Sequence, residues 1–139
     1  MNPSLRLMVV QKIYEKTTSS NKDISFQKHP YQRLIKKIFY GYFDKETELE
    51  AFLEKWLNKE KANIHNLELL LKIILKASIY ELIFIKKTPF KVVIDEYLEV
   101  TGKYFDQNQN NREISFSTAR QTAYIHDEQR KALVSGGVT

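Results

Sequence analysis

The stretch that decides the fold runs from Leu67 to Ile85 and reads LELLLKIILKASIYELIFI. Its apolar residues do not alternate with polar ones, as they would along a half-buried strand, and they cover most sides of a helix. Glu68, Lys72 and Lys76 follow one another at intervals of four and form a thin polar stripe, which we expect to reach water. A helix this apolar is usually the buried centre of a bundle.

The same stretch is almost long enough to cross a bilayer, but Glu68, Lys72, Lys76 and Glu81 interrupt it. Each charge at a bilayer centre costs about 2.5–3.5 kcal/mol, so we expect no membrane span. The apolar patch near the N-terminus is too short for a signal peptide. The chain has no cysteine, which excludes disulfides and thiolate metal sites and suits a reducing cytosol. We therefore expect a soluble, cytoplasmic protein.

Helical periodicity continues on both sides of this segment. In residues 31–43 the apolar positions are Tyr31, Leu34, Ile35, Ile38, Phe39 and Tyr42. In residues 46–58 they are Leu49, Phe52, Leu53, Trp56 and Leu57. Near the start, Leu5, Met8, Val9 and Ile13 form a shorter stripe, with Pro3 in a first helical turn. The pattern predicts three amphipathic helices.

After the central segment, Thr88 and Pro89 predict an N-cap and a first-turn proline for a helix that ends near Phe105. Its inward face would consist of Val93, Tyr97, Val100 and Tyr104. Residues 17–30, 59–66 and 106–111 are polar and predict loops. Because strand alternation is nowhere sustained, the sequence predicts an all-α fold.

Charge is distributed unevenly along the 139 residues, whose formal net charge is +5. Residues 1–43 carry eight Lys or Arg against Glu15 and Asp23, a net charge of +6. The other 96 residues carry 14 basic and 15 acidic groups and are nearly neutral. A basic third on a neutral body is typical of a polyanion binder, although lysines that only solubilise a helical face would give the same count.

No arrangement of residues indicates catalysis. His29, His65 and His126 are far apart, so no two of them have metal-ligating spacing, and the four glycines form no phosphate-binding loop. We therefore expect no catalytic residue, no metal and no cofactor, and a protein that is not an enzyme. Glu81 stands out because a glutamate in so apolar a helix needs a partner. It is either a structural tie to a neighbouring basic side chain or helix end, or an interface contact.

Two blocks of sequence resemble the signature of the NusB family of transcription antitermination factors. The first is ILKASIYEL at residues 74–82 and the second is TPFKVVIDEY at residues 88–97. The family typically has I-L-R-x-A-x-Y-E-L followed, after a short gap, by P-x-x-V-x-I-N-E. In addition, RLMVVQKIY at residues 6–14 resembles the opening R-x-x-A-x-Q-x-L-Y helix at the same spacing. The resemblance covers roughly residues 4–105.

The resemblance implies an all-α, NusB-like fold of two small helical bundles packed together. It also implies binding of the single-stranded boxA element of rRNA transcripts together with the ribosomal protein NusE, within an antitermination complex on RNA polymerase. The basic first helix of the family contacts RNA. The matching positions are Arg6 and Tyr14, and Lys12 is a local addition that supplies a further cation. Cations on phosphates and rings on bases are the means by which single-stranded RNA is held.

The chain departs from the family at both ends. Only residues 1–5 precede Arg6, without the run of arginines that many relatives have. The family's closing K-F-V-N-G-x-L-D motif stops at Phe116, after which Ser117 to Gln121 replace its asparagine-glycine-leucine pattern. Either a frame change in the gene or a diverged tail would produce this. We therefore expect a NusB-like RNA-binding domain over residues 1–116 and a poorly packed tail over residues 117–139.

Two other functions remain open on the sequence. A helical protein–protein adaptor could keep the NusB fold without RNA binding, and the thin arginine set and altered tail favour it. A NusB-like domain also precedes some rRNA methyltransferases, but we expect no catalytic domain in this chain. Some relatives form homodimers that would hide the RNA surface, and no sequence rule decides that point here.

Overall fold

A computed structural model describes residues 4–19, 23–59 and 67–105, and within these ranges every regular element is helical. The α-helices are α1 (Leu5–Thr18), α2 (Gln32–Asp44), α3 (Glu46–Lys59), α4 (Leu69–Tyr80) and α5 (Phe90–Phe105). A π-helical turn, Glu81–Ile85, continues α4. The all-α prediction is therefore confirmed for the described residues. The predicted boundary at residue 116 and the tail that follows it lie outside them.

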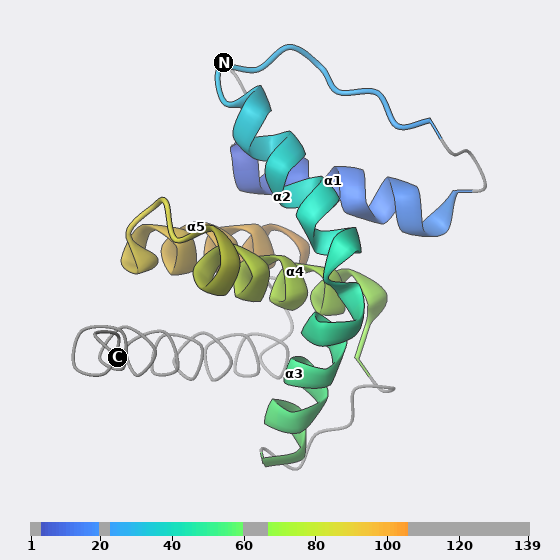
Figure 1. The fold of residues 1–139 in the computed structure, drawn as a ribbon, viewed down its shortest axis with the longest axis vertical. Helices are drawn as coiled ribbons and strands as arrows, with labels where there is room; N and C mark the ends of the chain where they lie inside the picture. The colour runs from blue at the N-terminus through green and yellow to red at the C-terminus, as the bar shows by residue number, and fades with distance from the viewer. Residues whose placement is uncertain (1–3, 20–22, 60–66, 106–139) are drawn as a thin grey trace, which may run out of the picture.

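Helix α4 is the centre of the fold, as its composition predicted. It contacts α1, α2, α3 and α5. Figure 1 shows α5 beside it, α1 and α2 crossing above it, and α3 continuing downward from the end of α2. An extended segment, residues 23–30, leads into α2 along the upper edge. Because α4 is covered from several directions, it can be apolar on most of its sides.

Each helix around α4 contributes one apolar stripe to the core. Its fully enclosed members include Val9, Val10 and Ile13 of α1, Ile38 of α2, Leu53 of α3, Leu71, Ala77 and Ile79 of α4, and Val93 of α5. Burying a Val, Leu or Ile side chain contributes about 1.5–3 kcal/mol, so these contacts supply the main stabilisation of the fold. The predicted stripe of α1 is confirmed at Leu5, Met8, Val9 and Ile13.

Helix α2 confirms its predicted stripe except at one end. Ile35, Ile38, Phe39 and Tyr42 are buried, but the Tyr31 side chain is 60% exposed. Tyr31 precedes the first helical residue, so the helical spacing that would carry its ring to the core does not apply to it. In α3, Leu49 and Leu53 are buried as predicted. The side chains of Trp56 and Leu57 lie outside the described residues.

The end of α4 differs from a plain helix. The chain widens into the π-helical turn at Glu81 and stops at Lys86, which adopts the left-handed conformation with φ 56°. A left-handed residue is a common way to end a helix, although it is less favourable for lysine than for glycine. The helical segment thus ends at Ile85, the end of the apolar stretch, but no sequence pattern indicated the wider turn, whose first residue, Glu81, is buried.

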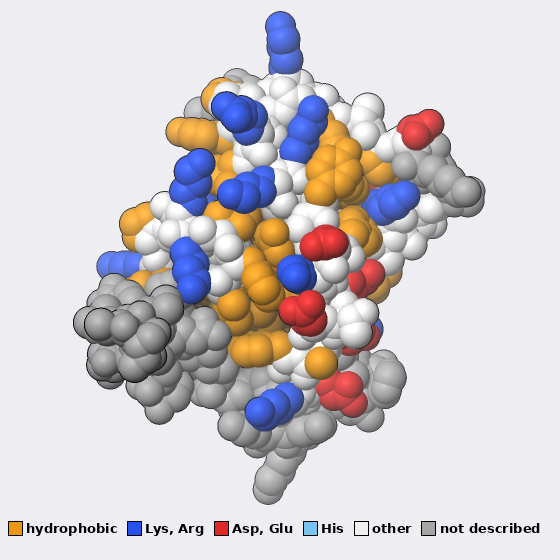
Figure 2. Space-filling model, viewed as in Figure 1, with side chains coloured by type: hydrophobic (Ala, Val, Ile, Leu, Met, Phe, Trp, Pro, Cys, Tyr) orange, Lys and Arg blue, Asp and Glu red, His pale blue; other side chains and the backbone are white. Residues whose placement is uncertain are grey.

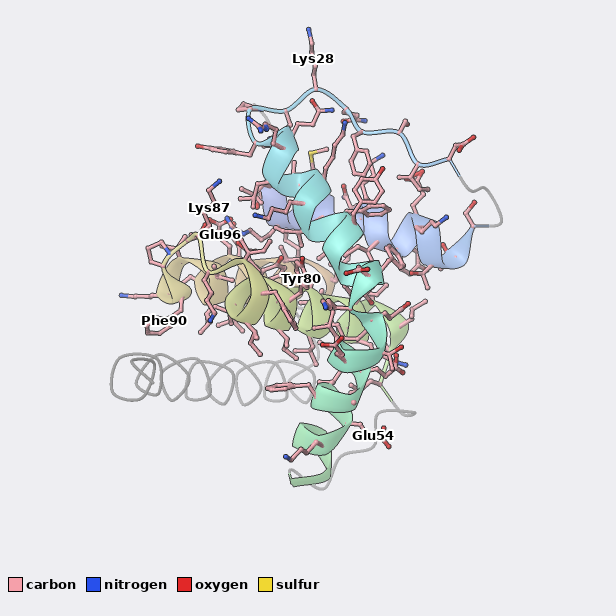
Figure 3. The ribbon with its side chains drawn as sticks, viewed as in Figure 1. Lys28, Glu54, Tyr80, Lys87, Phe90 and Glu96 are labelled. Atoms are coloured by element: carbon pink, nitrogen blue, oxygen red, sulfur yellow. The ribbon has the colours of Figure 1, made fainter. Side chains whose placement is uncertain are left out.

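Tyr80 packs closely against α2. Its ring stacks on that of Phe84 with centroids 5.3 Å apart, and it lies against Gly41 so tightly that a Cβ atom there would overlap the ring. Figure 3 labels Tyr80 near the middle of the molecule, beside α4. The Tyr80 ring can therefore pack against α2 at this position because Gly41 has no side chain.

Besides that of Tyr31, three sequence-based expectations about individual side chains were wrong. Lys76 does not reach water but is 3% exposed, because α3 covers this side of α4 with Glu46 and Glu50. Tyr104 is exposed, since no described element covers the last turn of α5. Thr88 is not the N-cap of α5: the carbonyl of Pro89 accepts the first helical bonds, and the Thr88 hydroxyl instead accepts a hydrogen bond from Arg6.

Among the described residues, no helix combines the length and the apolar character that crossing a bilayer requires. The same part of the chain contains no group of three or more His, Asp or Glu side chains arranged to hold a metal ion.

Candidate nucleic-acid interface

Arg6, the first predicted RNA contact, lies inside the protein. It is the second residue of α1, and it is only 2% exposed. Its Nε donates to Glu81 Oε1 at 3.1 Å, and its Nη2 donates to Glu81 Oε2, so the guanidinium and the carboxylate form a two-pronged pair. Its Nη1 donates to Glu96 Oε1 at 3.2 Å. Arg6 therefore ties α1 to the π-helical turn and to α5.

The same carboxylate receives a third hydrogen bond. The Tyr97 hydroxyl, on α5, donates to Glu81 Oε1 at 3.0 Å. Burial, and then the negative charge of Glu81, raise the pKa of Tyr97 well above its usual range, so the phenol stays neutral and remains a donor. Burial alone would lower the pKa of Arg6, but the hydrogen bond and charge of Glu81 outweigh it and raise that pKa. The pair is thus buried, and three hydrogen bonds to the Glu81 carboxylate hold it in place.

This arrangement answers the question that Glu81 raised in the sequence. Glu81 is 1% exposed and holds a basic side chain and a neighbouring helix, so it is a structural tie, as one of the two interpretations predicted. We call Arg6, Glu81, Glu96 and Tyr97 the buried cluster. Every donor nitrogen of Arg6 faces a partner in it, and none faces solvent where a phosphate could bind.

Lys12 and Tyr14, the other two predicted RNA contacts, lie nearer the surface of α1. Tyr14 is 42% exposed, whereas the Lys12 side chain is mostly covered and its Nζ lies 3.4 Å from Glu15 Oε2. Positions two apart on a helix point in nearly opposite directions. The structure therefore does not bring Arg6, Lys12 and Tyr14 together on one face of α1.

A second basic group lies on the outer face of α2 and was not chosen from the sequence. Arg33, Lys36, Lys37 and Tyr40 have the spacing i, i+3, i+4 and i+7, which places them on one side of a helix. All four are exposed, and Tyr40 is 58% exposed. The spacing of these cations is visible in the sequence, because they occupy helix positions that do not belong to the apolar stripe of α2. We call these four residues the outer face of α2.

The extended segment before α2 packs along this face. The Phe26 ring lies 5.6 Å from Lys36 Nζ and 6.1 Å from the Tyr40 ring, and it meets Phe39 of the core edge-on at 5.1 Å. Lys28 and Tyr31 of the same segment are exposed. Figure 2 shows Lys and Arg side chains gathered over this upper part of the molecule, with acidic side chains mainly to the right and below.

The cations of the outer face, and Lys28 before them, differ from the two lysines of α4 in their partners. Lys28, Arg33, Lys36 and Lys37 form no ion pair with any described residue. By contrast, Lys72 and Lys76 of α4 pair with Glu50 and Glu46 of α3 at 3.1–3.4 Å. In Figure 3, Lys28 stands at the upper edge of the molecule and Glu54 lies on α3 at the lower end. Four cations without an ion pair to described residues thus lie on α2 and on the segment before it.

Comparisons with known proteins agree with the resemblance seen in the sequence. The model of the NusB family matches residues 4–112. A curated transcription antitermination protein NusB from Rickettsia akari is 32% identical over 98 residues, which cover 70% of this chain and 57% of the relative. One from Rickettsia typhi is 29% identical over 89 residues, which cover 64% of this chain and 54% of the relative. The chain thus spans about half the length of these curated relatives.

No solved structure matches the chain. The relatives carry the name of a transcription factor and not of an enzyme, in agreement with the expectation of a non-enzymatic protein. The family model covers well over half of the chain, including all five helices described above. The chain therefore belongs to the NusB family.

Proposed function

We propose that this chain is a transcription antitermination factor that binds boxA-like single-stranded RNA of rRNA transcripts together with the ribosomal protein NusE. The observation that carries the proposal is the match of the NusB family model over residues 4–112. In this role the protein works in the cytoplasm as part of an antitermination complex on RNA polymerase, without catalysis or a cofactor. Its contribution is assembly, because two modest binders on one RNA gain from effective concentration.

The distribution of charge supports the RNA part of this proposal. Single-stranded RNA is held by cations on its phosphates and by rings on its bases. The described surface offers exposed rings at Tyr14 and Tyr40 and unpaired cations on α2. We propose Tyr14 as a stacking contact and Lys12, once released from Glu15, as a phosphate contact. Arg6 acts in this scheme by holding α1 against α4 and α5.

One experiment tests the proposal directly. A fluorescent boxA-like single-stranded RNA is titrated with the protein, with and without NusE, across a series of salt concentrations. We expect binding that NusE strengthens and that salt weakens, because phosphate contacts release counterions. Tyr14→Ala should weaken binding further. A folded protein that binds no RNA even with NusE would contradict the proposal.

A protein–protein adaptor is the second candidate, and one observation favours it. The cation that matches the family's RNA-contacting position, Arg6, is enclosed by Glu81 and Glu96. An adaptor would bind NusE with the same affinity whether or not RNA is present. Measuring the affinity for NusE with and without RNA therefore separates the two functions.

A further inference from the structure

We infer that the outer face of α2, together with Lys28 and Tyr31 of the preceding segment, is a binding surface for single-stranded RNA. The inference rests on the proposed function and adds to it a surface away from the α1 positions that the family resemblance indicated. It assigns phosphate contacts to Arg33, Lys36 and Lys37 and base stacking to Tyr40.

The first support is that these cations are available. They form no ion pair with described residues, and α2 has only one acidic residue, Asp44 at its last position. A lysine that already has a carboxylate must give up that partner before it can bind a phosphate, whereas these cations have no such partner among the described residues, and Lys36 has only the Phe26 ring. A negatively charged ligand on this face therefore competes with no carboxylate of α2 except Asp44, at the end of the helix.

The second support is the alternation of rings with cations. Tyr31 and Tyr40 are 60% and 58% exposed, and the Phe26 ring lies near both Lys36 Nζ, at 5.6 Å, and the Tyr40 ring, at 6.1 Å. Exposed rings form stacking platforms for unpaired bases, which a simple anion does not have. The combination of rings and cations on one helix face therefore favours single-stranded nucleic acid over other polyanions.

The third support is that the core holds α2, which carries this face, in a fixed position. The inward side of α2 is fixed in the core by Ile35, Ile38 and Phe39, and the Tyr40 ring meets Phe39 edge-on at 5.0 Å. A helix so anchored presents its outer side chains at fixed intervals, so Arg33 and Tyr40 are held about 10 Å apart along the axis. Little backbone order has to be gained on binding.

The test compares two variants with equal loss of charge. Lys36→Gln/Lys37→Gln removes two cations from the outer face of α2. Lys55→Gln/Lys103→Gln removes two exposed cations from α3 and α5. Each variant is titrated with boxA-like single-stranded RNA in the presence of NusE at several salt concentrations. We expect the first variant to flatten the slope of log affinity against log salt by about 1.4, since each phosphate contact contributes about 0.7 for a single strand. The control pair should leave the slope unchanged.

Tyr40 provides a readout that does not depend on charge. Tyr40→Leu should weaken RNA binding about fivefold or more without changing the salt slope, because stacking is lost while the phosphate contacts remain. Tyr40→Phe keeps the ring and should bind as the wild type does. Circular dichroism of each variant checks that the fold is intact.

The outcomes separate this inference from the function on which it rests. If the wild type binds RNA but Lys36→Gln/Lys37→Gln behaves as the control pair does, the α2 surface is refuted and the proposed function stands. If the wild type binds no RNA, both fail. If Lys36→Gln/Lys37→Gln weakens binding to vesicles of anionic lipid and not to RNA, the face binds a membrane and the inference is wrong.

Discussion

The buried cluster and the outer face of α2 use the same kind of charge for opposite purposes. Arg6 is enclosed by two glutamates, and its charge is paired within the fold. Arg33, Lys36 and Lys37 have no carboxylate partner among the described residues, and their charge is presented to solvent. The comparison teaches that the number of cations in a segment says little about binding until each cation's partner is known.

Breaking the buried cluster should have the largest effect on stability. Glu81→Ala removes the carboxylate and leaves the Arg6 guanidinium buried, with Glu96 and the Thr88 hydroxyl as its remaining partners. Removal of one partner of a buried pair costs about 3–5 kcal/mol in the free energy of unfolding, and the remaining contact with Glu96 favours the lower end. Urea denaturation measures it. Glu99→Ala, an exposed acidic residue on the same helix as Glu96, should change the stability by less than about 0.5 kcal/mol. Equal stability of the two variants would refute the structural role of Glu81.

Replacing the guanidinium by an ammonium should have a smaller effect. Arg6→Lys keeps the charge but cannot donate to both oxygens of Glu81 and to Glu96 and Thr88 in the same planar arrangement. We expect a loss of about 1–2 kcal/mol, the value of one or two charge-assisted hydrogen bonds. The midpoint of urea unfolding should fall without a change in its slope. A variant as stable as the wild type would show that the planar geometry does not matter.

The ion pairs between α3 and α4 predict a dependence of stability on pH. Burial would raise the pKa of Glu50, but hydrogen bonds and charges from Lys72 and Lys76 outweigh it, and the pKa is lowered. A carboxylate with a lowered pKa in the folded state stabilises the fold above its unfolded pKa of about 4.3 and loses that contribution as pH falls through the folded value. The free energy of unfolding should therefore decrease on acidification below about pH 4. Glu50→Gln should show a shallower decrease over the same range, and identical profiles would contradict the assignment.

Changes on the outer face of α2 should have the smallest effect on stability. Lys36→Gln/Lys37→Gln removes no described ion pair, so the free energy of unfolding should stay within about 0.5 kcal/mol of the wild type. The interaction of Lys36 with the Phe26 ring is solvent-exposed and weak. Urea denaturation of this variant beside Glu81→Ala makes the comparison quantitative. A loss as large as that of Glu81→Ala would mean that the two regions do not differ in the way described.

Periodicity predicted the helices well because each helix has a buried stripe that repeats at the helical period. The ends of α2 and α4 fall within a few residues of those predicted, and α5 runs to Phe105 as predicted. Periodicity failed at Lys76, since it identifies a polar position but not the helix that covers it. Glu46 and Glu50, which enclose Lys76, come from α3, 26 to 30 residues away.

The candidate site was harder to predict for the same reason. Arg6 has a family match and a basic side chain, and nothing local indicates that it is buried. Its partner Glu81 lies 75 residues away, and the π-helical turn that positions Glu81 has no sequence signature. The outer face of α2, in contrast, was readable from the spacing of Arg33, Lys36, Lys37 and Tyr40 alone. What the sequence lacked was the knowledge that these cations form no ion pair with any carboxylate of the described residues.

The most direct test of this account replaces the buried pair by a neutral one. Arg6→Gln/Glu81→Gln removes one cation and one anion together, so the net charge is unchanged and the two amides can still bond to each other. The measurement is the salt slope of binding to boxA-like single-stranded RNA with NusE, under conditions in which circular dichroism shows the variant folded. We predict the slope of the wild type, because Arg6 makes no phosphate contact. A slope flatter by about 0.7, the value of one lost contact, would contradict the account and return Arg6 to the RNA interface.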